Sequence, residues 1–556
     1  MQGERSRGDA DRAGRLARGL GLVPLACVLV PALAHAQVFA PGGLATTAPP
    51  TMAAPAAGGQ GAAPQRGGPG NLLPGLFDQF ALNADLSERY SSNAAGAPGG
   101  ESDYDTRLAL GMSGTSTTAH STLSFNYGFN ADYFAHESQN VIISNYLNAN
   151  AMAELVPEHV FLQAQAFANP VYINRAGNTG PAGVALPPGA NGDLQNFYGY
   201  VIQPDFAFHL GDFLHSDLLP SYNAEYFVQQ NGSAVSPLGG SLPNNLSTLG
   251  ITERLNSGDY FTRMQWGVIA SYSQMNPSAG GLTQRSATGE LSYAIDHGVS
   301  VVVDGGYQTV KADYALRDVL NGPIIMGGMQ FDLAKLTGKV LVGEQYHSFS
   351  GVGNLNYQLT PRLSLQAAAQ DNVNAPGANL VTPGALISGL LQGIASGQIQ
   401  LPPSGVMDLN GLINLVGLEN SIARFRTQTL SLLYNYGETS VTAAAFNTTQ
   451  DTENPLPAGQ NYNMRTTGVY ANIGHQFSQD VSGGLNILYH DDRLEVGGAS
   501  GMEYDASLNY RLNDTSSLYL VGDYYQRSSS QELTSVSASS GSVSAISILV
   551  GINHSF

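Results

Sequence analysis

From residue 77 to the C-terminus, apolar and polar side chains alternate one by one along the chain. In 122–133, Leu, Phe, Ala and Tyr occupy the odd positions, and Thr, Ser, Asn, Gly and Asp the even ones. The same alternation recurs in 147–155, 160–168, 263–272 and 502–512. Successive side chains on a β-strand point to opposite faces, so each segment has one apolar and one polar face. The sequence therefore predicts an all-β protein.

Composition supports this prediction and excludes other classes. Charged residues make up 12% of the chain, and 66 glycines and 27 tyrosines disfavour a helical protein. The formal net charge is −19, and the only lysines are Lys311, Lys335 and Lys339. Without a basic stripe to neutralise phosphates, a nucleic-acid partner is excluded.

Three features favour a transmembrane barrel over a soluble sandwich. The alternating segments run about 10–14 residues, which suits a tilted membrane crossing. Short connections such as 157–158, 296–298 and 513–514 alternate with long ones. The final segment ends in Phe556, which resembles the last-strand signal read by the barrel assembly machinery. We predict a transmembrane antiparallel outer-membrane β-barrel of about 22 strands (20–24), with short periplasmic turns and long external loops.

The first 76 residues lie outside this pattern. Residues 1–36 have five arginines, an apolar stretch over 20–33 and Ala34-His35-Ala36, which predicts a cleaved signal peptide. The only cysteine, Cys27, falls within it; an alternative is a lipoprotein cysteine. Residues 37–76 are rich in Ala, Pro and Gly, and we expect a disordered periplasmic tail. The barrel domain is then 77–556, and the predicted location is the outer membrane of a Gram-negative bacterium.

The chain resembles a family of uncharacterised outer-membrane β-barrel proteins, porin-like, that accompany PEP-CTERM/exosortase and exopolysaccharide systems in proteobacteria. Segments 84–90 (ADLSERY), 102–103 and 148–162 are similar to the opening strands of that family. Segment 322–371, which contains LTPRLSL at 359–365, is similar to its middle part. The resemblance implies a role in envelope polysaccharide or cell-surface biogenesis, but no defined biochemical activity.

A barrel of this size encloses a lumen that is usually plugged. Residues 37–76 are too short and too Pro-rich for the plug domain of an active siderophore-type transporter. The long loop 373–422 is the candidate plug or lid; the alternative is an external loop that stays outside the pore.

Alternation predicts which charged side chains face the lumen. The pore-lining candidates are Asp132, Glu154, Arg263, Glu290, Asp304, Glu503, Asp505 and Arg511. An excess of carboxylates favours cations or neutral saccharides over anions. The alternative is that these charges merely hydrate the interior.

Two further clusters have low-probability functional interpretations. His136, Ser138 and Asn150 resemble the catalytic residues of outer-membrane phospholipases, although a chance grouping among 11 histidines and many serines explains them better. Asp491 and Asp492 offer two carboxylates for Ca²⁺, which are too few for a defined site. We therefore predict no catalytic residues, no metal site and no cofactor.

The predicted function is an outer-membrane channel or export conduit. One alternative is a non-conducting surface scaffold that binds polysaccharide or partner proteins; another is a barrel-embedded lipid hydrolase. The expected partners are outer-membrane lipid and lipopolysaccharide, the barrel assembly machinery, and polysaccharide or envelope export proteins, with no nucleic acid.

Overall fold

The computed structural model describes residues 77–94, 100–136, 141–172, 194–229, 245–277, 282–312, 320–374, 423–452, 463–494, 498–529 and 541–556. The predicted signal peptide and tail lie outside the described residues. So does 375–422, which makes up most of the predicted loop 373–422.

The described residues form 22 strands, the predicted number. The strands are β1 (Gln79–Ser91), β2 (Asp103–Thr118), β3 (Ser121–Phe134), β4 (Val141–Val156), β5 (Val160–Tyr172), β6 (Leu194–Leu210), β7 (Leu214–Gln229), β8 (Asn245–Ser257), β9 (Met264–Pro277), β10 (Leu282–Asp296), β11 (Val299–Ala312), β12 (Leu320–Asp332), β13 (Leu336–Gln345), β14 (Ser348–Thr360), β15 (Leu363–Asn374), β16 (Ala423–Tyr436), β17 (Thr439–Thr452), β18 (Met464–Gln476), β19 (Val481–Leu494), β20 (Gly498–Arg511), β21 (Ser516–Ser529) and β22 (Gly541–Ser555).

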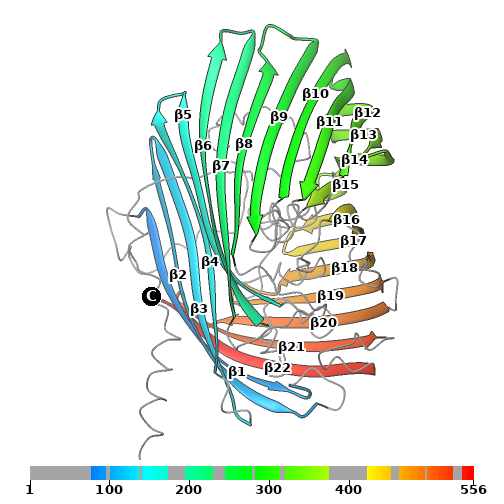
Figure 1. The fold of residues 1–556 in the computed structure, drawn as a ribbon. Coiled ribbons are helices and arrows are strands. Elements are labelled where there is room, and N and C mark those ends of the chain that lie inside the picture. Colours follow the sequence, from blue (N-terminus) through cyan, green and yellow to red (C-terminus); the bar gives the residue numbers. More distant parts are fainter. Residues whose placement is uncertain are drawn as a thin grey trace, which may run out of the picture.

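Each strand pairs antiparallel with the next, and β22 pairs with β1 to close the wall (Figure 1). The closing register runs from Asn83 opposite Ser555 to Ser91 opposite Ser547. Every strand therefore has a hydrogen-bonded neighbour on each side, which is the arrangement that crosses a bilayer with strands. The predicted outer-membrane β-barrel fold is confirmed. No helix in the described part of the chain is long and apolar enough to cross a membrane.

The two rims of the barrel differ in their connections. Short turns follow every even-numbered strand from β2 to β20, and we call this end the turn rim. We call the opposite end, where the odd-numbered strands end, the loop rim; the longest stretch of sequence between two strands there lies between β15 and β16. The N-terminal end of β1 and Phe556 both lie at the turn rim, where the Phe556 N–H donates to the Leu82 carbonyl at 2.8 Å.

The outer face of the wall is apolar. On β22, the side chains of Ile546, Ile548, Val550 and Ile552 are each about half exposed. They face outward, while Ser547 between them is buried on the other face. A contiguous exposed apolar surface of this kind fits contact with lipid rather than with water.

Aromatic side chains gather at the turn rim. Phe213, Tyr260, Phe261 and Trp266 form one group, with ring centroids 4.8–6.4 Å apart. On another turn, the Arg362 guanidinium lies 4.1 Å from the centroid of the Tyr436 ring. Rings with an apolar body and a polar edge are typical of the boundary between lipid and water.

The same aromatic group corrects one sequence prediction. Arg263 was expected on a strand, but β9 begins at Met264 and Arg263 belongs to the connection 258–263. The N–H of Tyr260 donates to the Asp212 carbonyl and that of Phe261 to the Gly258 carbonyl, so these residues form a turn instead of continuing the β8–β9 ladder.

A second correction concerns the hairpin that was expected at 339–348 and 351–360. The turn falls at Tyr346-His347, between β13 and β14, and it is the shortest connection of the loop rim. Both residues have positive φ, 53° and 59°, as in a type I′ turn. Type I′ turns favour Gly, Asn and Asp, so Tyr346 and His347 carry no sequence signal for a turn at this place.

Candidate functional site

The inner face of the barrel carries most of the charged side chains of the wall. Glu290 and Asp304 are buried, while Leu291 and Val303, their neighbours along the strands, are half exposed on the outer face. By this alternation the inner face carries the carboxylates of Asp85, Asp103, Asp105, Asp132, Glu154, Asp205, Asp217, Glu290, Asp304, Glu503, Asp505 and Asp523. Its bases are Arg89, Arg107, Arg254, Lys339 and Arg511. Carboxylates therefore outnumber bases on the described inner face.

The predicted pore-lining residues occupy three levels of the barrel. Glu290, Asp304, Glu503 and Asp505 lie five to eight residues from the turn rim, in the middle of their strands. Asp132 lies near the loop rim, where it accepts a hydrogen bond from Arg107 at 2.7 Å.

The other two predicted residues on strands lie at the turn rim. Glu154 pairs with the His120 ring at 2.7 Å, and Arg511 pairs with Asp480 at 2.9 Å. They belong to the mouth of the barrel rather than to its middle.

Buried ion pairs that the sequence analysis missed line the wall near the closing seam. Arg89 on β1 donates to Asp105 on β2 at 2.6 Å, and both side chains are about 4% exposed. Tyr519 on β21 donates to Asp85 at 2.7 Å. Alternation along 83–89 and 103–107 was the available signal, because it places all of these polar residues on one face.

A second ion pair spans three strand spacings. Lys339 on β13 reaches across the inner faces of β12 and β11 to Glu290 on β10, with Nζ and Oε2 2.6 Å apart. Asp304 lies on β11 directly opposite Glu290. Lys339 is therefore the cation that compensates two neighbouring carboxylates in the middle of the wall.

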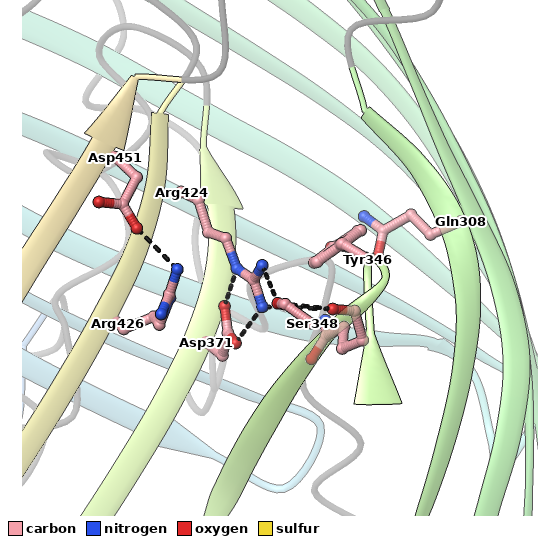
Figure 2. Close-up of polar contacts among 8 residues, drawn as sticks. Gln308, Tyr346, Ser348, Asp371, Arg424, Arg426 and Asp451 are labelled. Carbon is pink, nitrogen blue, oxygen red and sulfur yellow. Dashed lines mark hydrogen bonds and ion pairs between the residues drawn. The ribbon is translucent and has the colours of Figure 1, made fainter. Parts of the chain in front are cut away.

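The most connected polar cluster lies near the loop rim, between β13 and β16 (Figure 2). Arg424 donates to both carboxylate oxygens of Asp371, at 2.7 and 2.6 Å, and to the Ser348 hydroxyl at 2.5 Å. Its third partner is the Gln345 carbonyl at 3.3 Å. Arg424 and Asp371 are almost completely buried.

Tyr346 completes this cluster. The Arg424 guanidinium lies 5.1 Å from the centroid of the Tyr346 ring, and the Tyr346 hydroxyl donates to Gln308 Oε1 at 2.6 Å. The contacts of the ring and hydroxyl explain how a tyrosine is held at positive φ in a tight turn. The cluster thus connects the β13–β14 turn to β11 on one side and to β15 and β16 on the other.

The structure does not bring Asn150, the third residue of the catalytic alternative, close to His136. Asn150 on β4 lies opposite Ser124 on β3. Ser124 is twelve residues before His136, which follows the loop-rim end of β3, so Asn150 and His136 lie at different levels of the wall. His136 contacts Asp103 instead, through Nδ1 at 2.7 Å. Ser138 lies outside the described residues.

The residues considered for a metal site are also placed. Asp491 accepts a hydrogen bond from Arg493 at 2.9 Å. Asp492 is on β19, and its side chain lies outside the described part. In the described ranges, no three His, Cys, Asp or Glu side chains gather where they could hold a metal ion.

No family model and no curated protein matches the chain. Among solved structures it is similar to the siderophore receptor PirA from Pseudomonas aeruginosa, with 12% identity and a TM-score of 0.39 over 86% of this chain and 80% of that one. It is also similar to the FrpB iron transporter from Neisseria meningitidis (10%, TM-score 0.44, 87% and 82%) and to the copper transporter OprC (10%, 0.37, 87% and 82%). At these values the likeness carries no argument about function.

Proposed function

We propose that the protein is an outer-membrane channel or conduit for cationic or neutral hydrophilic solutes. The observation that supports this most directly is the excess of carboxylates on the inner face of a closed 22-strand wall. Carboxylates along a passage raise the local concentration of cations and repel anions.

The level of these carboxylates supports a role in selectivity. Glu290, Asp304, Glu503 and Asp505 share the middle third of the wall, although they come from two distant parts of the chain. A solute that crosses the barrel has to pass this level. Neutral saccharides remain compatible with it, because a polar wall can offer them hydrogen bonds without a charge penalty.

A link to exopolysaccharide or PEP-CTERM cell-surface biogenesis is a finer proposal. It rests on the family resemblance of 84–90, 148–162 and 322–371 alone. Its direct test is deletion of the gene, with measurement of secreted polysaccharide.

The channel proposal is tested by the ion selectivity of the reconstituted barrel in a salt gradient. We expect a reversal potential of the sign given by cation preference. Neutralising the four carboxylates together (E290Q, D304N, E503Q, D505N) should move it toward zero. The matched control is Glu88→Gln, because Glu88 lies on the outer face, where it accepts a hydrogen bond from Thr106 at 2.7 Å. An unchanged potential in the fourfold variant would contradict the proposal.

A further inference from the structure

The wall of the barrel opens between β14 and β15. Pairing of these strands runs upward from the turn rim and stops at Gly353 opposite Ala369. Both strands continue toward the loop rim, β14 over 348–352 and β15 over 370–374. In this upper part, β14 pairs with β13 and β15 pairs with β16, but no pair joins β14 to β15 among the described residues.

Gly353 marks the point where β14 turns away. Its φ is +155°, and a Cβ atom there would lie 2.2 Å from the Lys339 carbonyl oxygen. A side chain is therefore excluded at this position, and the glycine permits the bend.

The opening begins at membrane depth. Gly353 is seven residues above Thr360, which corresponds to about 18 Å at ~3.3 Å per residue and ~40° tilt. The apolar band of such barrels is about 25 Å tall. β4 and β5 also part, above Leu147 and Ala168, but that point is nine residues above Val156 and thus close to the top of the band.

Apolar side chains lead inward from the opening. Val302, Ile324, Met326 and Leu341 form a buried cluster on the inner faces of β11, β12 and β13. Val352, on the separated part of β14, packs against them. On the outer side, Phe349 is 77% exposed on the same stretch of β14. The opening therefore joins a lipid-type outer surface to an apolar patch of the inner wall.

Separated strand edges expose backbone groups without ladder partners. At membrane depth, such edges are tolerated only where protein covers them or where they line a water-filled cavity. The polar cluster of Arg424 bridges this opening at its upper end, because Arg424 bonds to Asp371 on β15, to Ser348 at the start of β14 and to Gln345 at the end of β13.

We propose that the gap between β14 and β15 is a lateral portal, which admits the acyl chain of a membrane amphiphile to the apolar cluster of the inner wall. The Arg424 cluster limits its width. The portal goes beyond the proposed channel, since it leads to the membrane rather than across it.

The test uses quenching of a fluorophore by lipids with brominated acyl chains. In the full chain with Cys27→Ser, the label is attached at Val352→Cys, at Asn356→Cys as the inner-face control or at Tyr357→Cys as the outer-face control. Asn356 lies on the paired part of β14, opposite Gln366. Tyr357 is 40% exposed on the apolar face.

We expect brominated lipid to reduce fluorescence at residues 352 and 357 but not at 356. Arg424→Gln should increase quenching at residue 352. Arg426→Gln, two residues further along β16, should leave this quenching unchanged. If quenching at 352 equals that at 356, both with and without Arg424→Gln, the portal does not exist. This result is independent of conductance, so the failure of one proposal is distinguishable from the failure of the other.

Discussion

Arg424 on β16 holds both carboxylate oxygens of Asp371 on β15, although the two strands already pair through their backbones along residues 423–434 of β16. The planar guanidinium matches the carboxylate in a bidentate contact, which is stronger than a single hydrogen bond. Both side chains are buried, and the remaining guanidinium donor reaches Ser348. The Arg424 side chain therefore connects β15 and β16 to the start of β14, at a level where no backbone pair joins β14 to β15 among the described residues.

Arg424→Gln should lower the free energy of unfolding by about 3–5 kcal/mol, because it leaves the Asp371 carboxylate buried without its partner. Arg426→Gln is the matched control. Arg426 lies two residues further along β16 and pairs with Asp451 on β17 at 2.7 Å, but both side chains are about 40% exposed. We expect its loss to cost at most about 1 kcal/mol. Unfolding by guanidinium chloride in lipid vesicles measures both, and equal losses would contradict the assignment.

Gly353→Ala should destabilise the barrel by about 1–3 kcal/mol, since an alanine there has both an unfavourable φ and a clash with the Lys339 carbonyl. Gly522→Ala on β21 is the control, because a Cβ at Gly522 meets no atom within 4 Å. Its unfolding midpoint should stay close to that of the parent. A Gly353→Ala barrel as stable as Gly522→Ala would show that β14 does not need this bend.

The Tyr346-His347 turn predicts opposite effects for two neighbouring substitutions. His347→Gly should raise the unfolding free energy by about 0.5–1 kcal/mol. Glycine adopts the positive φ of 59° at this position without steric cost, and the His347 ring that is lost is exposed. Tyr346→Gly should lower it, because it removes the contacts to Gln308 and Arg424. If both glycines stabilise the barrel, the turn is held by its backbone alone.

Lys339 and Glu290 should behave as a coupled pair. Lys339→Gln leaves Glu290 and its neighbour Asp304 uncompensated on the inner face, so we expect a loss of stability. Adding Glu290→Gln should restore part of it. The coupling energy from the double-mutant cycle should fall within about 0.5–3 kcal/mol. Strict additivity of the two substitutions would mean that the 2.6 Å contact carries no net energy.

Much of the fold follows from alternation alone. Because each segment such as 122–133 separates apolar from polar residues with a period of two, strand number, order and inner face could all be predicted. The errors lie where other forces decide. In the connection before β9, the backbones of Tyr260 and Phe261 bond to Asp212 and Gly258, and alternation cannot anticipate these turn contacts.

The polar clusters were harder to predict than the strands. Asp132 and Glu290 were found as single inward charges, but their partners Arg107 and Lys339 were not. Lys339 lies three strands away from Glu290, and nothing local in either segment indicates the contact. Arg424, Asp371 and Ser348 come together only because β14 leaves β15 at Gly353, which depends on the packing of the whole wall.

The central claim is that solutes cross the membrane through the barrel lumen, past the carboxylates of its inner face. Single-channel conductance in a planar bilayer tests this claim most directly. The measurement compares the full chain with a variant that lacks 375–422, and adds the fourfold carboxylate variant to each. We predict cation-selective conductance in at least one of the two backgrounds, with selectivity lost on neutralisation. Silence from both forms, with a folded barrel confirmed by heat-modifiable migration, would contradict the channel and favour a non-conducting scaffold.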